Sequence, residues 1–93
     1  MDIVREIKRA IETGKVYFGL DQARKSLRNK TAKLFIVANN CPDPYFLQET
    51  VENVPTIIFQ GTSTELGSVC GKMFDVSIIT VIDPGESSLI KKE

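Results

Sequence analysis

The chain has 93 residues, equal numbers of basic and acidic side chains and 42% hydrophobic residues, a composition typical of a soluble globular domain. A chain of this length can form one hydrophobic core but not two separate ones. No apolar run approaches the ~20 residues that cross a bilayer, and the first residues lack the basic and apolar segments of a secretory signal. We therefore expect one domain over residues 1–93, located in the cytoplasm and without membrane contact.

The chain contains few of the residues that catalysis and metal binding usually require. Histidine is absent, so the commonest general base and the histidine-containing zinc sites are excluded. The two cysteines, Cys41 and Cys70, lie far apart in sequence, and two thiols alone do not make a structural zinc site. Neither a P-loop nor a G-x-G-x-x-G motif occurs. The sequence therefore predicts a protein that is not an enzyme, with free, packed thiols and with no metal or cofactor.

Basic and acidic side chains are distributed unevenly along the chain. Residues 1–33 contain nine basic and four acidic side chains, whereas residues 34–93 contain three basic and eight acidic ones. The first third therefore carries a net charge of +5 and the remainder a net charge of −5. Such asymmetry allows one face of a neutral protein to meet a polyanion, although a charged run also forms on an ordinary solvated helix face.

The first third of the chain predicts two helices separated by a short strand. Asp2 is a candidate N-cap, apolar residues recur at helical spacing over residues 3–11, and Gly14 is suited to end the helix. Residues 16–18 are a short β-rich run. Asp21 is then a candidate cap for a second helix that carries several outward-facing basic residues.

The rest of the chain predicts strands and short helices in alternation. Residues 34–38 are apolar at every position, which indicates a strand covered on both faces. The elements that follow are a third helix from the prolines at 42 and 44 to near Asn53, a strand over 56–59, a helix from a capping box at Thr62 and Glu65 to Gly71, a strand over 76–82, a turn over 83–85, and a last short helix capped by Ser87 or Ser88. Alternating helices and apolar strands predict a sheet with helices on both faces, which is the α/β class.

Three of the predicted loops combine residue types that bind nucleic acid. Gly19 precedes a helix whose first backbone N–H groups attract phosphate. Asn39 and Asn40 place two amides, each a donor and an acceptor, at the end of a buried strand. Lys72 and Phe74 set a cation near an aromatic ring that can stack on an unpaired base. Each feature also has a structural explanation, because glycine permits turns, amides satisfy loop backbones and phenylalanine fills cores. The residues alone leave both interpretations open.

Several motifs in the chain are those of one known family and follow in the same order along nearly its whole length. The most specific are Ala-Asn-Asn-Cys-Pro at residues 38–42 and Asp-Pro-Gly-Glu-Ser at residues 83–87. The others are Gly14-Lys15, Gly19, Lys25-Ser26-Leu27-Arg28, Ala32-Lys33-Leu34, Glu65-Leu66-Gly67 and Cys70-Gly71-Lys72. On these motifs the chain resembles the ribosomal protein L30e family, which lies within the L7Ae superfamily of kink-turn-binding proteins.

The resemblance implies a three-layer α/β/α sandwich, for which we expect a mixed four-stranded sheet. It implies a place in the large subunit of the cytoplasmic ribosome, with ribosomal RNA as partner and neighbouring ribosomal proteins as further contacts. The RNA would be a kink-turn-like internal loop, recognised by its shape, by helix N-termini and by a stacking aromatic rather than as plain duplex. We expect a monomer when the protein is free. The rival interpretation is a protein-interaction module in which the Met73-Phe74 loop docks a partner protein.

The family contacts RNA from three places that match this chain: the turn after Gly19, the loop at residues 39–40, and the loop over residues 72–76. In the family the aromatic residue matching Phe74 packs against an exposed nucleotide, with the position of Val76 close by. The resemblance therefore assigns RNA binding to Gly19, Asp21, Gln22, Lys25, Asn39, Asn40, Lys72, Phe74 and Val76.

Two positions depart from the superfamily's Gly-x-Asn-Glu-x-x-Lys pattern, which aligns with residues 19–25. Asp21 replaces the asparagine and, when ionised, only accepts hydrogen bonds. Gln22 replaces the glutamate and offers a weaker partner to an N–H donor. The segment 43–53 is also shorter than is usual in the family, which we interpret as a trimmed third helix away from the RNA face.

Overall fold

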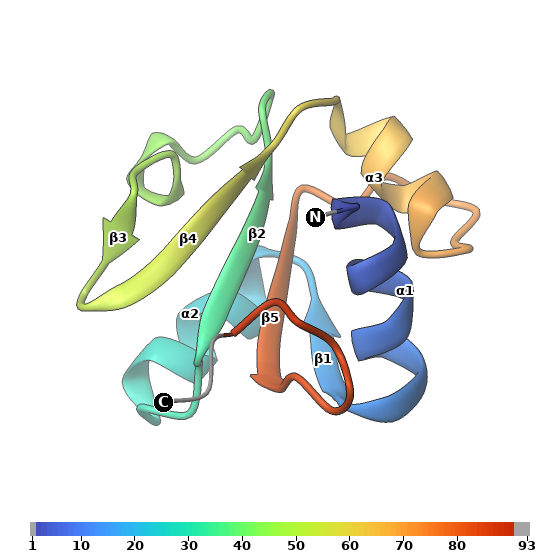
Figure 1. The fold of residues 1–93 in the computed structure, drawn as a ribbon. Helices are drawn as coiled ribbons and strands as arrows, with labels where there is room; N and C mark the ends of the chain where they lie inside the picture. Colours follow the sequence, from blue (N-terminus) through green and yellow to red (C-terminus); the bar gives the residue numbers. More distant parts are fainter. Residues whose placement is uncertain (1, 91–93) are drawn as a thin grey trace.

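A mixed sheet runs through the middle of the computed structural model, which describes residues 2–90 (Figure 1). Its strands within this range are β1 (Lys15–Phe18), β2 (Leu34–Ala38), β3 (Thr50–Val51), β4 (Val54–Phe59) and β5 (Ile78–Asp83). They lie in the order β1-β5-β2-β4-β3, with β2 and β4 parallel and the other neighbours antiparallel. The helices in the same range are α1 (Ile3–Thr13), α2 (Leu20–Arg28), α3 (Ser63–Val69) and a single 3-10 turn, η1 (Pro44–Phe46).

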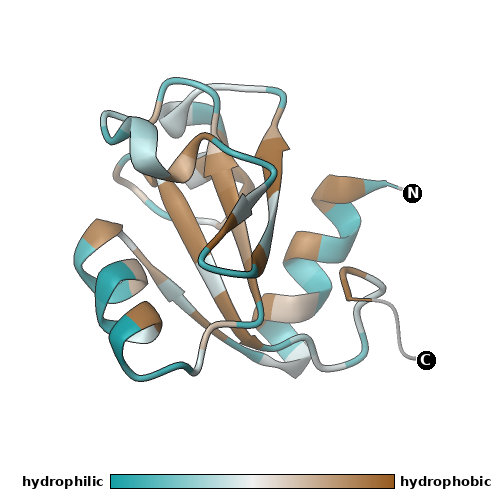
Figure 2. Cartoon of the chain, turned by 90° about the vertical axis from the view of Figure 1, so that its left-hand side faces the viewer, coloured by the Kyte–Doolittle hydropathy of each residue, from teal (hydrophilic) through white to brown (hydrophobic). Residues whose placement is uncertain are grey.

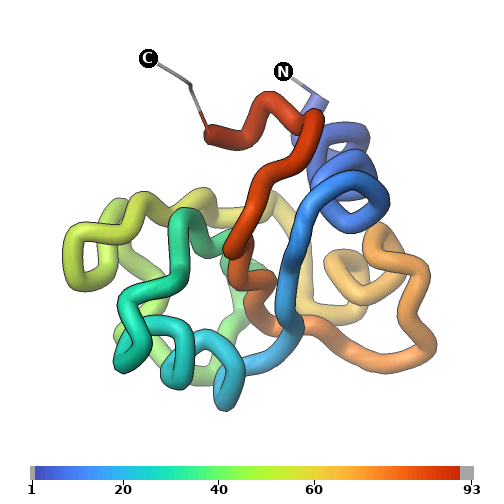
Figure 3. Tube along the Cα trace, turned by 90° about the horizontal axis from the view of Figure 1, so that it is seen from below, coloured from blue at the N-terminus to red at the C-terminus, as the bar shows by residue number. Residues whose placement is uncertain are grey.

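Apolar side chains on both faces of the sheet produce its layers. The side chains of β2 alternate, so that Leu34, Ile36 and Ala38 belong to one core cluster. Phe35 and Val37 belong to the other. Helices α1 and α3 contribute to the first cluster, and α2 with η1 contributes to the second. Seen from below, α1 and α2 lie on opposite sides of the sheet (Figure 3), and the hydrophobic strands are enclosed by helices with hydrophilic outer faces (Figure 2). The predicted three-layer α/β/α sandwich is confirmed.

The ends of α1 and α3 follow the capping signals in the sequence. The Asp2 carboxylate and the Thr62 hydroxyl each accept a hydrogen bond, 3.3 Å long, from the backbone N–H three residues later. Gly14 ends α1 at a point where a β-carbon would collide with the carbonyl oxygen of Asp83. The predicted starts of these two helices are confirmed. No helix within residues 2–90 is long and apolar enough to cross a membrane.

The start of α2 differs from the prediction. The helix begins at Leu20, so the prediction that Asp21 caps it is wrong. Gly19 occupies the cap position with a φ of 98°, in the left-handed region that favours glycine. This conformation turns the chain from β1 straight into the helix and leaves Asp21 exposed in the first turn.

The predicted third helix is replaced by η1 and a β-hairpin, so the sheet in residues 2–90 has five strands where four were predicted. The η1 turn has Pro44 at its start and is capped by the Asp43 carboxylate, which accepts a hydrogen bond from the Tyr45 N–H at 3.1 Å. Glu52 and Asn53 then both adopt positive φ angles, of 50° and 70°. Two successive left-handed residues make the two-residue turn that suits a hairpin, and this turn joins β3 to β4.

The predicted last helix is also absent within the described residues, which end at residue 90. After the turn over 83–85, the Ser87 hydroxyl donates back to the Pro84 carbonyl at 2.7 Å instead of capping a helix. The Ser88 backbone N–H donates to the Glu6 carboxylate on α1 at 2.6 Å. The segment therefore runs as an irregular strap that is tied to α1.

Thr80 lies fully buried in the sheet, opposite Tyr17 on β1 and Phe35 on β2. Its Oγ1 has no hydrogen-bond partner among the described residues. A buried hydroxyl without a partner costs about 1–3 kcal/mol, and valine has nearly the same shape without this atom. We predict that Thr80→Val raises the free energy of unfolding by about 1 kcal/mol in denaturant melts. Thr50→Val on the exposed edge strand β3 serves as control and changes it by under about 0.5 kcal/mol. A less stable Thr80→Val protein would contradict the prediction.

Candidate nucleic-acid interface

The three loops that the sequence indicates as binding loops meet at one end of the sheet. β1 and β2 end there and β5 begins there, because β5 runs antiparallel to both. The backbone N–H of Gly19 donates to the Ile78 carbonyl at 3.0 Å, and that of Ala38 donates to the Ser77 carbonyl at 2.8 Å. The turn after β1, the loop after β2 and the loop before β5 are therefore fixed beside one another.

The start of α2 presents both backbone and side-chain groups to solvent. No side chain caps this helix, so its first N–H groups are available to an anion, which the helix dipole also favours. Gln22 and Lys25 are exposed on the helix. The carboxylate of Asp21 lies 3.9 Å from the Arg24 guanidinium, with the Asp21 side chain fully exposed. At that distance and exposure the ion pair adds little stability, but it partly offsets the charge of the aspartate.

A salt bridge joins α2 to the loop that follows β2. The Arg24 guanidinium donates to the Asp43 carboxylate at 2.6 Å. This bond, followed by the one from the Tyr45 N–H, holds the pKa of Asp43 below its usual range. The stability that it contributes is therefore present above the ordinary pKa of aspartate and is lost as the pH falls through the lowered pKa. Sequence reasoning missed this pair, because no local pattern connects residues nineteen positions apart.

The two asparagines after β2 have different roles. Asn40 Oδ1 accepts a hydrogen bond from the backbone N–H of Ser63 at 2.8 Å and so satisfies the start of α3. The backbone N–H of Asn39 donates to the Gly61 carbonyl at 3.0 Å. Both asparagines are exposed, and within residues 2–90 the side chain of Asn39 makes no hydrogen bond. Asn39 therefore offers a whole amide to a ligand, whereas Asn40 offers its N–H groups and an oxygen that already accepts one hydrogen bond.

The loop over residues 71–77 is held against α3. The Asp75 carboxylate accepts hydrogen bonds from the Thr64 hydroxyl at 3.0 Å and from the Ser63 hydroxyl at 3.5 Å. Gly67 permits the close approach, because a β-carbon at this position would collide with the carbonyl oxygen of Phe74. The loop therefore rests on a helix that is itself attached to Asn40.

This loop turns Met73 and Phe74 outward and buries Val76. Met73 is fully exposed and Phe74 is 61% exposed, so Phe74 does not fill the core and its ring is open to a stacking partner. Val76 is 2% exposed, packs in the cluster beneath α1 and α3, and so supports the loop from below. Lys72 Nζ lies 4.8 Å from the centre of the Phe18 ring at the end of β1.

Most of the residues expected to bind RNA therefore lie on the three loops at this end of the sheet, with Val76 covered beneath them, whereas Lys25 lies in the last turn of α2. Cations and donors predominate among the groups that remain open, since Asp43 and Asp75 are already bonded within the protein. Such an arrangement suits binding of a polyanion that also exposes an unpaired base.

The two thiols have no part in this region's chemistry. Cys41 and Cys70 are free and pack on opposite faces of the sheet. Burial raises the pKa of Cys41 above its usual value and raises the pKa of Cys70 to about 11. Both thiols are therefore protonated near neutral pH and are poor nucleophiles. Among the described residues, no group of three or more His, Cys, Asp or Glu side chains could hold a metal ion.

Comparison with known proteins shows a likeness over nearly the whole chain. The model of the ribosomal protein L7Ae/L30e/S12e/Gadd45 family matches residues 1–91. The chain is 42% identical to the large ribosomal subunit protein eL30 of Methanopyrus kandleri, over 96% of this chain and 85% of that protein. It is 39% identical to the protein of the same name from Methanothermobacter thermautotrophicus, over 98% of this chain and 97% of that protein. For Methanosarcina mazei the identity is 34%, over 97% of this chain and 87% of that protein.

Gly67 provides a test of how firmly the loop is held. Gly67→Ala forces the added methyl group against the Phe74 carbonyl, and relief of such a clash costs about 1–3 kcal/mol. We predict a loss of this size in the free energy of unfolding, measured by denaturant melts. Ser68→Ala, at the next and exposed position of α3, is the control and changes it by under about 0.5 kcal/mol. Equal stability of the two variants would mean that the loop moves away from α3 freely.

Proposed function

Because the chain belongs to the ribosomal protein L7Ae/L30e/S12e/Gadd45 family, we propose that it binds a kink-turn-like internal loop of ribosomal RNA with the loops at the end of its sheet. It is an RNA-binding large-subunit ribosomal protein of the eL30 kind, which works on the cytoplasmic ribosome and is not an enzyme. What we propose is the type of RNA that the chain binds and the residues that contact this RNA.

The exposure of Phe74 is the observation that carries the proposal. A phenylalanine that is 61% exposed in a loop braced against a helix contributes little to folding. Its ring can cover one base, since stacking on an aromatic ring contributes about 1–3 kcal/mol per base. Lys72, two residues earlier, brings a cation to the Phe18 ring at the end of β1, one residue before the turn into α2. An aromatic ring and a cation in one loop suit a nucleotide that has left its helix.

The other two loops supply contacts of different kinds. The open N–H groups at the start of α2, after Gly19, together with Lys25, hold backbone phosphates. Asn39 and the amide N–H groups of Asn40 bond to base edges or sugars. Asp21 is fully exposed, and its carboxylate accepts a hydrogen bond from the N–H of a base. It does not bind a phosphate, because both groups are negatively charged. Gln22 beside it both donates and accepts.

This set of contacts favours a kinked internal loop over plain duplex. Double-stranded RNA keeps its bases stacked and has a major groove that side chains cannot read. A kink-turn exposes unstacked bases, which Phe74 and the asparagines can reach. The chain carries no net charge, so we expect few phosphate contacts and a shallow dependence of affinity on salt. We also expect the free protein to be a monomer, with no cofactor.

The full exposure of Met73 favours a second candidate function. Met73 and Phe74 together form an apolar tip that could dock a neighbouring ribosomal protein. Association of the tip with a protein would survive treatment with nuclease, whereas association through RNA would be lost. RNA binding is the better supported of the two, because Lys72, Asn39 and the start of α2 lie in the same region.

The proposal is tested with two RNAs that differ only in the kink. One is a kink-turn with its sheared G·A pairs, and the other carries substitutions of those pairs that leave both stems intact. We expect gel shifts with the first RNA at protein concentrations that do not shift the second. Equal affinity for the two RNAs would overturn the proposal of shape-selective binding.

Phe74 separates the stacking contact from a structural role. We predict that Phe74→Ala lowers the free energy of unfolding by under about 1 kcal/mol, because the ring is mostly exposed. Binding to kink-turn RNA should weaken by ~1–3 kcal/mol in gel shifts. Phe74→Tyr, which keeps an aromatic face, is the matched control and should retain affinity. A destabilised Phe74→Ala protein with unaltered RNA affinity would show that the ring does not stack on RNA.

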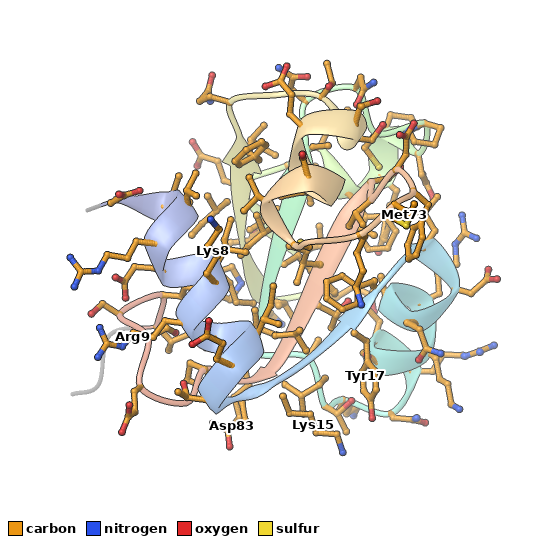
Figure 4. The ribbon with its side chains drawn as sticks, turned by 90° about the vertical axis from the view of Figure 1, so that its right-hand side faces the viewer. Lys8, Arg9, Lys15, Tyr17, Met73 and Asp83 are labelled. Carbon is orange, nitrogen blue, oxygen red and sulfur yellow. The ribbon has the colours of Figure 1, made fainter. Side chains whose placement is uncertain are left out.

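Lys25 tests the phosphate contact along α2. We predict that Lys25→Ala weakens binding of kink-turn RNA by ~1–2 kcal/mol, the scale of a charge-assisted hydrogen bond. The slope of log affinity against log salt should fall by about one. Lys8→Ala is the control, because Lys8 is also an exposed lysine but lies on α1, on the opposite side from α2 (Figure 4). If Lys25→Ala behaves like Lys8→Ala, Lys25 lies outside the interface.

A further inference from the structure

A groove of about 320 Å³ lies between the edge strand β1 and helix α2. Lys15 and Tyr17 line it from the strand, and Gln22, Lys25 and Asn29 line it from the helix. None of the described residues that line the groove is acidic. The groove therefore has a positive, hydrogen-bonding lining in a protein whose net charge is zero.

The helix wall of the groove is polar at positions where a helix that packs on a sheet is usually apolar. Gln22, Lys25 and Asn29 are spaced by three and four residues, so they lie on one stripe of α2. Ser26 lies on the same stripe, and its hydroxyl is bonded to the Gln22 carbonyl at 2.8 Å. The buried Ala23 belongs to a different stripe, which packs on the core. The side chains of α2 that face β1 therefore do not pack tightly against the strand as core residues would, and they leave room for a polar ligand.

Strand β1 contributes an aromatic ring and a second cation to the groove. Along β1, Val16 and Phe18 pack on the core beneath α1, so Lys15 and Tyr17 point to the face that carries α2. Tyr17 is 37% exposed, and Lys15 Nζ lies 5.6 Å from the centre of its ring. Figure 4 shows the two side chains next to each other, below α2. A ring beside an ammonium group provides one surface for a base or sugar and one for a phosphate.

The groove is continuous with the proposed RNA-binding region. Gln22 and Lys25 belong to both, while Asn29 and Thr31 lie at the far end of the helix. At a rise of 1.5 Å per residue, the nine residues of α2 span about 13 Å. An RNA strand that is bound at the start of α2 can therefore continue along the groove beside β1 and stay in contact with the protein.

We propose that the β1–α2 groove receives the backbone of an RNA strand that leaves the kinked loop, with Lys15 on a phosphate and Tyr17 against a sugar or base. The inference rests on the proposed function, because the loops must hold the kink for a strand to enter the groove. It adds a contact that none of the three binding loops contains. It also gives a role to Lys15, one of the basic residues of the segment 1–33 that lies outside those loops.

The test compares several kink-turn RNAs. One has two short stems, and in the others one of the two stems is lengthened. We expect Lys15→Ala to lower the affinity for an RNA with one long stem by about five- to thirtyfold, the same scale as the loss expected for Lys25→Ala. The salt slope should fall by about one, and Lys15→Glu should bind more weakly still. Tyr17→Ala should weaken binding of the same RNA, and Tyr17→Phe should retain it. Affinity for the RNA with two short stems should be unchanged in every variant.

Lys8→Ala on the far side of the molecule controls for a general change in charge, and thermal melts of each variant control for folding. The groove proposal is overturned if Lys15→Ala and Tyr17→Ala bind every RNA with the affinity and salt slope of wild type. In that case wild type still prefers the kinked RNA, and the proposed function stands. Failure of wild type to prefer the kinked RNA would overturn both. If an acidic peptide bound wild type but not Lys15→Glu, and Lys15→Glu kept the RNA affinity of wild type, the ligand of the groove would be a protein partner and not an RNA strand.

Discussion

The position of β5 between β1 and β2 is the constraint on which the rest of the interface depends. Hydrogen bonds on both sides hold β5 in register, so the residues that lead into it cannot move independently. Ser77 is bonded to Ala38, and Ile78 is bonded to Gly19. Three loops that lie far apart in the sequence thereby share one rigid frame. A surface that is already arranged before binding loses less conformational freedom when a ligand arrives.

Helix α3 adds a second support to this frame. Its start is bonded to Asn40 on one side and to Asp75 on the other, and Gly67 lets the loop lie directly on it. The Phe74 side chain contributes little to the stability of the fold, since most of its ring remains in water. The fold's contribution is to fix the ring's position, so that binding energy is not spent on ordering the loop. In the function that we propose, rigid support of this exposed aromatic ring serves binding rather than stability.

Local signals in the sequence predicted much of the fold, and long-range contacts account for most of what they missed. The strand over residues 34–38 was predictable because every position is apolar and both faces are buried. The hairpin at residues 52–53 was not, because its left-handed turn lacks the usual Asn-Gly or Asp-Gly signal. The Arg24–Asp43 bridge arises only when the packed sheet brings the two residues together. Residue type and family resemblance pointed to the loop of Phe74, but the contacts that hold this loop against α3 are long-range and could not be read from the sequence.

Both edges of the sheet are short, which affects how the protein behaves before it meets its RNA. β3 has two residues, and β1 has four with an irregular register between Lys15 and Val16. Unpaired edge strands are the places where another chain can add its own strand, and short, irregular or lysine-bearing edges discourage this. Lys15, which lines the groove from β1, therefore also discourages another chain from adding its strand at this edge.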